Sequence, residues 1–322
     1  MGTLNDTGLH IFGYFLVSSS VKYIILRWLS KRKRDYELVG RVQKIYSYPI
    51  KSCMAMPLKS ADCTKHGLKD EGVTDRHWIC LHNGEILTLK AEPRLCLMNI
   101  TIDKDDIIIS VPNRENLRLP KLLPPTKENI IQANIYGELR DVVDCGESAS
   151  KWISEFLDRS DIRIGFSPPD LPKRDMSQIS RSWPYNGEEG DAAVFTYSTP
   201  YLLVSSSSLH EVNNGLDKPV PILRFRPNIV IDGTIPFDED EWQYVKIGND
   251  IQFRIVEPCR RCIITTIDPA TGIKEKGFQP LKHLRSFRCI APYGTSPLFG
   301  VYVALEKPGL IQIGQPVCAL RK

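Results

Sequence analysis

Alternation of apolar and polar residues dominates the first half of the chain and predicts short β-strands separated by turns. Residues 38–50 (LVGRVQKIYSYPI) alternate in this way and run into a proline at Pro49. The Asn83-Gly84 pair, which separates two β-rich runs, is typical of a tight hairpin turn. The other predicted strands of this half cover residues 77–81, 84–89, 96–103, 106–111, 130–136 and 138–144.

A helical spacing of apolar residues interrupts these strands. Trp152, Ile153, Phe156 and Leu157 fall on the buried face of an amphipathic helix predicted over residues 149–158. The first half of the chain therefore predicts a small antiparallel β unit closed by one helix.

Residues 165–191 are rich in proline, glycine and charge, and are interpreted as a linker or a mobile surface segment between domains. Beyond them the sequence predicts a strand near 192–197 and a helix that starts at Pro200, with Thr199 as its N-cap. Further strands are predicted at 227–232, 243–247, 250–256, 262–267, 299–305 and 310–318. The pattern indicates a mainly β (α+β) chain with a few helices.

The N-terminal segment is treated separately because it is strongly apolar. Residues 9–29 (LHIFGYFLVSSSVKYIILRWL) contain Lys22 and Arg27, and the basic run KRKR follows at 31–34. A membrane span needs roughly 20 apolar residues, so a single-pass anchor and an amphipathic helix docked on a surface both stay open. If the segment spans, its basic flank places the rest of the chain on the cytosolic side.

Composition adds little beyond a globular class. A chain of 322 residues has room for about two domains, and its 42% hydrophobic and 25% charged residues are ordinary. The formal net charge of +4 owes much to residues 31–34, so the charge pattern does not favour nucleic-acid binding.

The nine cysteines are widely spaced and odd in number, which argues against a disulfide framework and favours a reducing compartment. Two of them, Cys259 and Cys262, flank two arginines in the segment EPCRRCIITTIDP over residues 257–269. Fixed positive charge biases a neighbouring thiol toward thiolate, the form that acts as nucleophile or soft-metal ligand. The spacing alone leaves open half a zinc site, a redox pair and two inert core cysteines.

Several basic and hydroxyl residues stand where an anionic ligand would suit them. Lys51-Ser52 follow the first strand, Arg226 enters an apolar strand, and Ser198-Thr199 precede the predicted helix, whose N-terminus would favour an anion. Asp75-Arg76 is interpreted as a local surface ion pair. The sequence has no GxGxxG, GxxxxGK[ST], GxSxG or HExxH motif, so the common nucleotide-binding, hydrolase and zinc-protease classes have no support.

Six short segments carry a combined order and spacing: Tyr48–Ser52 (YPIKS), Asp75-Arg76, Phe225–Asn228 (FRPN), Arg261-Cys262, Thr265–Asp268 and Ser296–Gly300 (SPLFG). Together they resemble the MOSC family (molybdenum cofactor sulfurase C-terminal), and within it the mitochondrial amidoxime-reducing components. The resemblance covers nearly the whole chain and implies a membrane anchor over residues 1–35, a MOSC N-terminal β-barrel domain over 36–160 and a MOSC domain over 161–322. It also implies a place on the mitochondrial outer membrane, with the catalytic domains facing the cytosol.

Carried over residue by residue, the resemblance implies that Cys262 is the catalytic thiolate and the protein ligand of molybdenum, a soft donor for a metal already held by sulfur. Cys259 would lie near the metal without binding it. The sequence departs from the family pattern at Arg260, where a small hydroxyl residue is common, and in the order of Ser198-Thr199. The implied cofactor-binding residues are Lys51, Ser52, Arg76, Ser198, Thr199, Arg226, Asn228, Arg260, Arg261 and Tyr302.

The resemblance implies reduction of N-hydroxylated compounds, such as amidoximes and hydroxylamines, to amidines and amines. No flavin or haem motif is visible, so electrons would arrive from outside the chain. The resemblance implies cytochrome b5 and its NADH-dependent reductase on the same membrane as the donors. Two alternatives stay open: a non-catalytic molybdenum-cofactor-binding or sulfur-carrier module, and a membrane-tethered interaction protein that has lost the cofactor.

Overall fold

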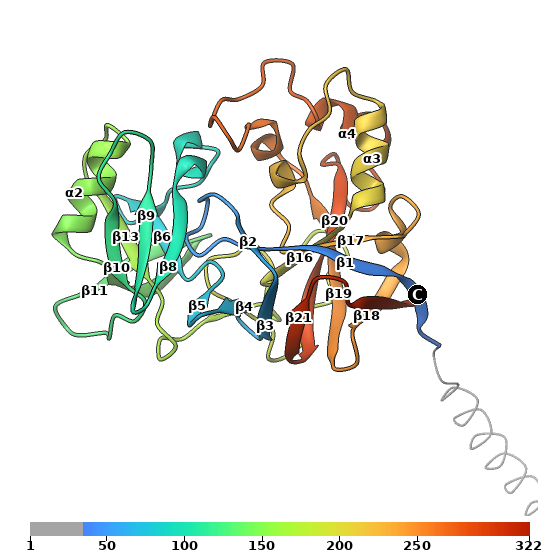
Figure 1. Cartoon of the computed structure of the whole chain (residues 1–322), viewed down its shortest axis with the longest axis horizontal. Coiled ribbons are helices and arrows are strands. Elements are labelled where there is room, and N and C mark those ends of the chain that lie inside the picture. The colour runs from blue at the N-terminus through green and yellow to red at the C-terminus, as the bar shows by residue number, and fades with distance from the viewer. Residues whose placement is uncertain (1–34) are drawn as a thin grey trace, which may run out of the picture. The chain divides into compact units, whose positions relative to one another are not determined.

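The computed structural model describes residues 35–322, and this part of the chain is mainly β (Figure 1). Its three α-helices are α2 (Glu147–Phe156), α3 (Ser206–Asn214) and α4 (Leu281–Phe287). The mainly β class is therefore confirmed. The predicted N-terminal membrane helix lies outside the described residues, and no helix within residues 35–322 is long and apolar enough to cross a membrane.

The larger sheet joins the two ends of the described chain. The first strand, β1 (Glu37–Ser47), lies between β22 (Pro316–Arg321) and β2 (Met56–Leu58). It also pairs with β17 (Ile229–Asp232), so the sheet closes on itself. Figure 1 shows the blue strand β1 running among the yellow and red strands of the C-terminal half. In order across this 8-stranded sheet the strands are β17 (Ile229–Asp232), β16 (Tyr201–Ser205), β20 (Leu298–Lys307), β19 (Ile251–Arg260), β18 (Trp242–Ile247), β22 (Pro316–Arg321), β1 (Glu37–Ser47) and β2 (Met56–Leu58).

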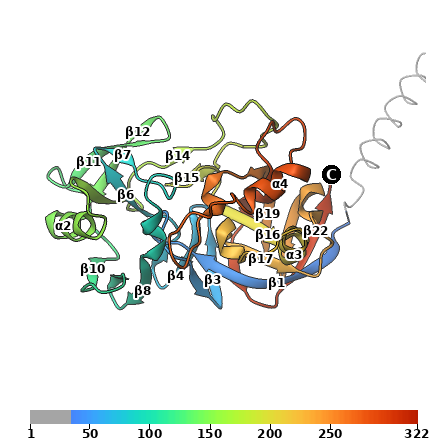
Figure 2. The same ribbon diagram turned by 90° about the horizontal axis from the view of Figure 1, so that it is seen from above.

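The middle of the chain forms a second, smaller barrel, drawn in green in Figures 1 and 2. Helix α2 packs on β13 and closes it, with Ile153 and Leu157 fully buried as the helical spacing predicted. The barrel strands are β11 (Ile130–Ile135), β12 (Glu138–Asp144), β13 (Ile162–Phe166), β6 (Trp78–His82) and β7 (Glu85–Ile86). Beside it lies the 3-stranded sheet of β10 (Leu117–Pro120), β9 (Asp106–Ser110) and β8 (Asn99–Asp103).

Short strands complete the fold. The sequence predicted two of them as parts of longer runs, residues 192–193 in the run at 192–197 and residues 309–312 at the start of the run at 310–318. The others have few apolar residues, so alternation is hard to detect in them. One sheet has the order β21 (Gly309–Gln312), β3 (Ser60–Thr64), β4 (Gly67–Asp70) and β5 (Val73–Thr74). A separate pair joins β14 (Arg174–Asp175) and β15 (Ala192–Ala193), and the 3₁₀ turns are η1 (Pro93–Leu97), η2 (Ile222–Phe225), η3 (Asp238–Glu241) and η4 (Ile263–Thr266).

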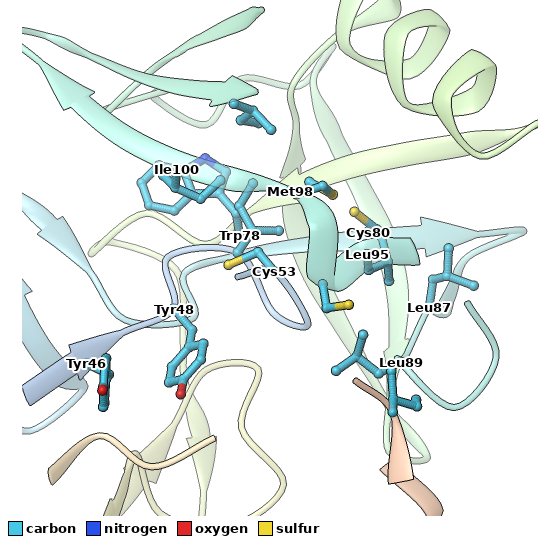
Figure 3. Packing of buried hydrophobic residues seen from close by; sticks show 14 of the residues in the cluster. Tyr46, Tyr48, Cys53, Trp78, Cys80, Leu87, Leu89, Leu95, Met98 and Ile100 are labelled. Carbon is cyan, nitrogen blue, oxygen red and sulfur yellow. The ribbon is translucent and has the colours of Figure 1, made fainter. Parts of the chain in front are cut away.

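One buried cluster contains residues of both halves of the chain, from Tyr46 to Phe299. Figure 3 shows Trp78, Cys53, Cys80 and Met98 within it. Trp78 stacks on Phe166 with ring centroids 4.5 Å apart, a geometry that adds to the stabilisation from burial. Because this cluster is shared, each half of the chain buries apolar surface against the other.

The hairpin and most of the long strands are confirmed. Asn83 and Gly84 both have positive φ, 52° and 75°, as a type I′ turn between β6 and β7 requires. The predicted run at 84–89 is shorter in the structure, only Glu85–Ile86, and the run at 96–103 begins as a 3₁₀ turn before β8.

Two predicted elements of the second half are wrong. Residues from Pro200 form strand β16 rather than a helix, since Tyr201–Ser205 is held between β17 and β20 in the core. The helix begins only at Ser206, where the Ser205 hydroxyl caps it by accepting from the backbone N–H groups of Ser207 and Ser208. The predicted strand at 262–267 is the 3₁₀ turn η4. Tertiary pairing overrode the local signals in both places.

Glu239 is a fully buried carboxyl group beside this helix start. Its two oxygens accept from the Ser208 hydroxyl at 3.0 Å each, and one also accepts from the Ser205 backbone N–H at 3.4 Å. Burial raises the pKa of Glu239 from 4.5 to about 7, and the nearby Asp240 adds to the shift. Folding therefore favours the protonated form of this group.

We expect Glu239→Gln to gain stability over the wild type as pH rises from about 4.5 to 7. In that window the unfolded chain loses the Glu239 proton while the folded chain keeps it, so the wild type loses stability and the amide variant does not. The difference in free energy of unfolding should change by about 3 kcal/mol across the window. Urea titrations at several pH values measure it; Asp250→Asn, at an exposed site, is the control and should show no such trend.

Candidate functional site

A cavity of about 610 Å³ opens among β1, β16, β19 and the turns that follow them. It is within the range of volumes that hold small ligands and cofactors. Ser198 alone among the predicted site residues does not line it. The predicted residues on its wall are Lys51, Ser52, Arg76, Thr199, Arg226, Asn228, Arg260, Arg261, Cys262 and Tyr302.

Three of these wall residues have left-handed backbones. Ser52 has a φ of 77°, Arg76 of 53° and Arg226 of 55°. For residues with a side chain this conformation costs on the order of 1 kcal/mol each, and it persists only where surrounding contacts fix it. Such outliers gather at sites where a side chain must be aimed in one direction, as these are.

The contacts that fix Arg76 are buried. Asp75 pairs with the Arg76 guanidinium, and its other oxygen accepts from the Tyr48 backbone N–H at 2.7 Å. Arg76 also donates to the side-chain oxygen of Asn228 at 3.1 Å and to the Arg226 carbonyl at 3.3 Å. Asp75 is only 1% exposed, so the interpretation of Asp75-Arg76 as a surface pair is wrong.

Asn228 is a structural hub as well as a wall residue. Its amide nitrogen donates to the Tyr46 carbonyl at 3.2 Å, and its oxygen accepts from the Leu202 N–H at 3.2 Å in addition to Arg76. It thereby ties β1 to β16 at the cavity, and these contacts use both ends of its amide.

Two guanidinium groups lie over the Tyr48 ring. The centre of Arg226 is 4.2 Å from its ring centroid and that of Arg76 is 4.7 Å away. Arg226 donates to the Cys53 carbonyl at 2.8 Å, whereas its Nη2 is buried without a hydrogen-bond partner. A buried arginine nitrogen without a partner is costly, and an anion in the cavity would remove that cost.

Lys51 adds a third positive charge to this group. Burial, together with the charges of Arg76, Arg226 and Arg174, lowers the pKa of its amine to about 7, and Asp75 opposes this shift. Its Nζ lies 5.2 Å from the centre of the Tyr136 ring, which belongs to the turn between β11 and β12. The first half of the chain therefore contributes both a cation and an aromatic wall.

The two cysteines of the Cys259-x-x-Cys262 segment have different environments. Cys262 is exposed and lines the cavity, at the start of η4. Cys259 is buried on β19, and burial raises the pKa of its thiol although Arg261 and a hydrogen bond with Tyr302 act in the other direction. The expectation that both thiols are biased toward thiolate is thus wrong for Cys259.

Arg261 holds the backbone around Cys262. It donates to the Phe299 carbonyl at 2.8 and 2.6 Å and to the Phe225 carbonyl at 2.9 Å. The rings of Phe225 and Phe299 stack at 4.0 Å beside it. Much of the hydrogen-bonding capacity of this buried arginine is used by the protein, which fixes the position of its neighbour Cys262.

The segment interpreted as a linker carries a loop, residues 176–191, which we call the strap. The strands β14 and β15 pair at its base, where the Met176 N–H donates to the Asp191 carbonyl at 2.9 Å. Midway, the Asn186 N–H donates to the Val256 carbonyl of β19 at 3.0 Å. The strap therefore packs on β19, and the interpretation of this segment as a free linker is wrong.

Two buried side chains of β19 hold the strap. Arg254 pairs with Asp191 at 2.8 Å and also donates to the Asn186 carbonyl. Glu257 accepts from the Trp183 indole N–H at 2.7 Å and from Arg181 at 3.4 Å. Loops closed at the base and pinned in this way are frequently functional.

Comparison with known proteins identifies the family. The MOSC N-terminal beta barrel domain matches residues 39–160, and the MOSC domain matches residues 190–318. The mitochondrial amidoxime-reducing component 1 of Homo sapiens is 36% identical over 91% of this chain and 87% of its own length. The mitochondrial amidoxime reducing component 2 of Bos taurus is 34% identical over 89% of this chain and 85% of its own.

This chain belongs to the MOSC-domain family. The Danio rerio amidoxime-reducing component 1 is 30% identical to it over 89% of the chain, so the similarity extends across distant vertebrates. The predicted domain boundary near residue 160 stays a prediction. The sheets do not divide at that residue, since β1 and β2 of the first half are strands of the sheet that the C-terminal half forms.

Two predicted residues of the MOSC site have surroundings that the sequence did not foresee. The Ser198 hydroxyl is buried and donates at 2.7 Å to Glu257, the carboxylate that holds the strap, and Ser198 does not line the cavity. Thr199 lines the cavity with its hydroxyl buried and unpartnered. Neither residue lies at a helix N-terminus, since β16 follows, and the anion site expected from a helix dipole is absent there.

Sequence reasoning missed several wall residues of this MOSC chain. Tyr136, Trp183, Tyr197 and Glu257 all line the cavity. The rings of Tyr136 and Tyr197 meet edge to face with their centroids 5.4 Å apart, although the two residues are distant in the sequence. The one usable signal was Glu257, an acidic residue inside an apolar strand directly before the cysteine pair.

We expect Lys51→Met to stabilise the cofactor-free protein by about 1 kcal/mol, because it removes one of several crowded positive charges. The folded pKa of Lys51 is lowered, so stability of the wild type rises with pH above about 7 and the advantage of the variant should shrink there. Denaturant unfolding at pH 6.5 and pH 9 measures this. Lys276→Met, at an exposed lysine, is the control; an equal gain in both variants would contradict the explanation.

Proposed function

We propose that this MOSC-domain chain is a molybdenum-cofactor-dependent oxidoreductase that reduces N-hydroxylated compounds, such as amidoximes and hydroxylamines, to amidines and amines. The relatives named amidoxime-reducing components support this proposal, since they align over about nine-tenths of the chain. Among the features of the site, the one that carries it is an exposed thiol, Cys262, on the wall of a cavity lined with unpaired cationic donors.

The residues present fit a phosphate-bearing pterin. Arg226 Nη2 and the Thr199 hydroxyl are buried, line the cavity and lack partners. Lys51 and Arg76 add positive charge on the same wall. A phosphate would give these donors charge-assisted hydrogen bonds, which are about twice as strong as neutral ones. The cluster is thus electrostatically incomplete in a way that this cofactor would satisfy.

Cys262 suits the role of the metal ligand. A thiolate is a soft donor, and soft donors are favoured by redox metals that other sulfur atoms already hold. Cys262 is exposed and directly precedes the η4 turn, so its sulfur is accessible from the cavity. The Arg261 hydrogen bonds to Phe299 and Phe225 would keep that orientation during turnover.

Within this proposal the bound cofactor supplies two-electron redox chemistry, and the protein binds, orients and shields. Lys51, Arg76 and Arg226 would hold the phosphate, while Ser52, Thr199 and Tyr302 offer hydroxyl groups to the polar ring system. Leu89, Leu202 and Ile264 provide apolar wall that limits access of water. Lys51, with its pKa near 7, can hold or release a proton at Nζ at neutral pH.

The proposal extends to partners and location. The sequence shows no flavin or haem motif, so electrons would come from outside the chain. On the family resemblance, the donors would be cytochrome b5 and its NADH-dependent reductase. The relatives' names support a mitochondrial location. An outer-membrane site with the domains facing the cytosol would follow if residues 9–29 anchor the chain. Sharing one membrane would raise the effective concentration of donor and acceptor.

The test is elemental and pterin analysis of the purified full chain, together with benzamidoxime reduction in a reconstituted chain of NADH, cytochrome b5 reductase and cytochrome b5. We expect about one molybdenum per chain and formation of benzamidine. Molybdenum without turnover would favour the non-catalytic cofactor-binding or sulfur-carrier alternative. Neither metal nor turnover would leave only an interaction protein.

Cys262→Ala is expected to abolish benzamidoxime reduction, since it removes the proposed metal ligand. Cys259→Ala is the matched control on the same segment and should retain molybdenum, because that thiol is buried and already hydrogen-bonded to Tyr302. Activity and molybdenum content measured on both variants decide the assignment. An equal loss in the two variants would refute it.

A further inference from the structure

Arg260 is a cavity-wall arginine that no carboxylate pairs with in the described part of the chain. Its Nη2 donates to the Ser296 hydroxyl at 3.3 Å, and its Nε is buried without a partner. It stands two positions before Cys262, so their Cα atoms are at most about 7 Å apart. A charged group of this kind in a ligand cavity is short of an anion.

The strap sets the orientation of this arginine. The guanidinium centre of Arg260 lies 3.9 Å from the Trp183 ring centroid, the closest of the arginine–aromatic contacts in the cavity. Glu257 fixes the indole by accepting its N–H at 2.7 Å, so the ring cannot turn away. Stacking on an aromatic face leaves the in-plane donors of a guanidinium available for a planar, bidentate partner.

The strand itself is irregular where Arg260 begins to face the cavity. The pairing of β19 with β20 shifts register between Pro258 and Arg260, and Arg260 then lies opposite Leu298. Such bulges occur beside active sites, where they re-aim a side chain. The bulge and the strap together hold Arg260 in one direction before any ligand binds.

Arg260 belongs to a different set of contacts from the other cations. Arg76 and Arg226 both stack on Tyr48 and bond to the segment around Cys53 and Asn228. Within residues 35–322 the Arg260 guanidinium stacks on Trp183 of the strap and donates to Ser296. One cavity therefore has two cationic groups on separate supports, and a phosphate held by the first leaves the second without an anion.

We infer that Arg260, stacked on Trp183, is a specificity-determining residue that binds a carboxylate of the substrate, so that the enzyme prefers N-hydroxylated compounds carrying an anionic group. This inference rests on the proposed function and names the substrate class for the same site. Arg260 was grouped with the cofactor residues on the resemblance; its contacts assign it to the substrate instead.

The kinetic test compares 4-carboxybenzamidoxime with neutral benzamidoxime in the reconstituted system. The wild type should have a kcat/KM about tenfold to a hundredfold higher for the carboxylate, the effect of hydrogen bonds to a charged group. In Arg260→Ser this preference should vanish, chiefly through KM. Arg260→Lys keeps the charge but not the planar fork, so it should restore part of it.

Controls separate a binding role from a structural one. Arg285→Ser removes the same charge from an exposed site on α4 and should keep the full preference. Molybdenum and pterin content is measured on each variant. The inference is overturned if the wild type shows no preference, if Arg260→Ser retains it, or if Arg260→Ser loses the cofactor, which would return the residue to the cofactor site.

A binding measurement keeps the inference independent of turnover. Isothermal titration of the purified full chain uses two amidines, 4-amidinobenzoate and benzamidine, which are not reduced. Tighter binding of 4-amidinobenzoate by the wild type, lost in Arg260→Ser, supports the carboxylate site even if neither amidoxime is reduced. Equal binding of both amidines overturns it. Absence of all reduction alone counts against the proposed function only.

Discussion

The site depends on one buried set of interactions, the pairing of Asp75 with Arg76 and of Arg76 with Asn228. Through it the Tyr48 backbone, the Arg226 carbonyl and the strands β1 and β16 meet at a single point. Breaking a buried pair leaves an uncompensated charge and costs about 3–5 kcal/mol. The same set holds Arg76 and Arg226 in left-handed conformations. These buried contacts offset the backbone strain that comes with aiming the two cations at the cavity.

Two groups of contacts then divide the work around the cavity. The segment from Tyr48 to Arg76 and the turn at Arg226 concentrate positive charge where an anion would relieve it. On the other side, Arg254 and Glu257 on β19 hold the strap, and the strap holds Trp183 against Arg260. Cys262 lines the same cavity as both groups and follows Arg260 and Arg261 in the sequence, and Arg261 fixes its backbone. This arrangement suits a cofactor bound by the first group and a substrate bound by Arg260 in the second.

The cavity is an outcome of chain topology rather than of any one segment. Strand β1 leaves the first half of the chain to close the C-terminal sheet, which carries Lys51 and Ser52 to the cavity. The β11–β12 hairpin of the smaller barrel brings Tyr136 to Lys51. Buried apolar residues of both halves form one cluster, so the packing that stabilises the fold also sets the distance between the groups that line the site.

The sequence by itself determined the mainly β class, most long strands, the Asn83-Gly84 hairpin and helix α2. These features follow from local periodicity and turn chemistry, which a single chain displays directly. The residues that gather on the cavity wall were predicted from the family resemblance that short motifs carry. Only the tertiary structure decided that Tyr201–Ser205 is a strand, that Asp75-Arg76 is buried, that the two cysteines differ in exposure and that residues 176–191 pack on β19. Each of those depends on a partner distant in sequence. Local propensity and residue spacing do not reveal such a partner, so they cannot predict the free energy of the contact with it.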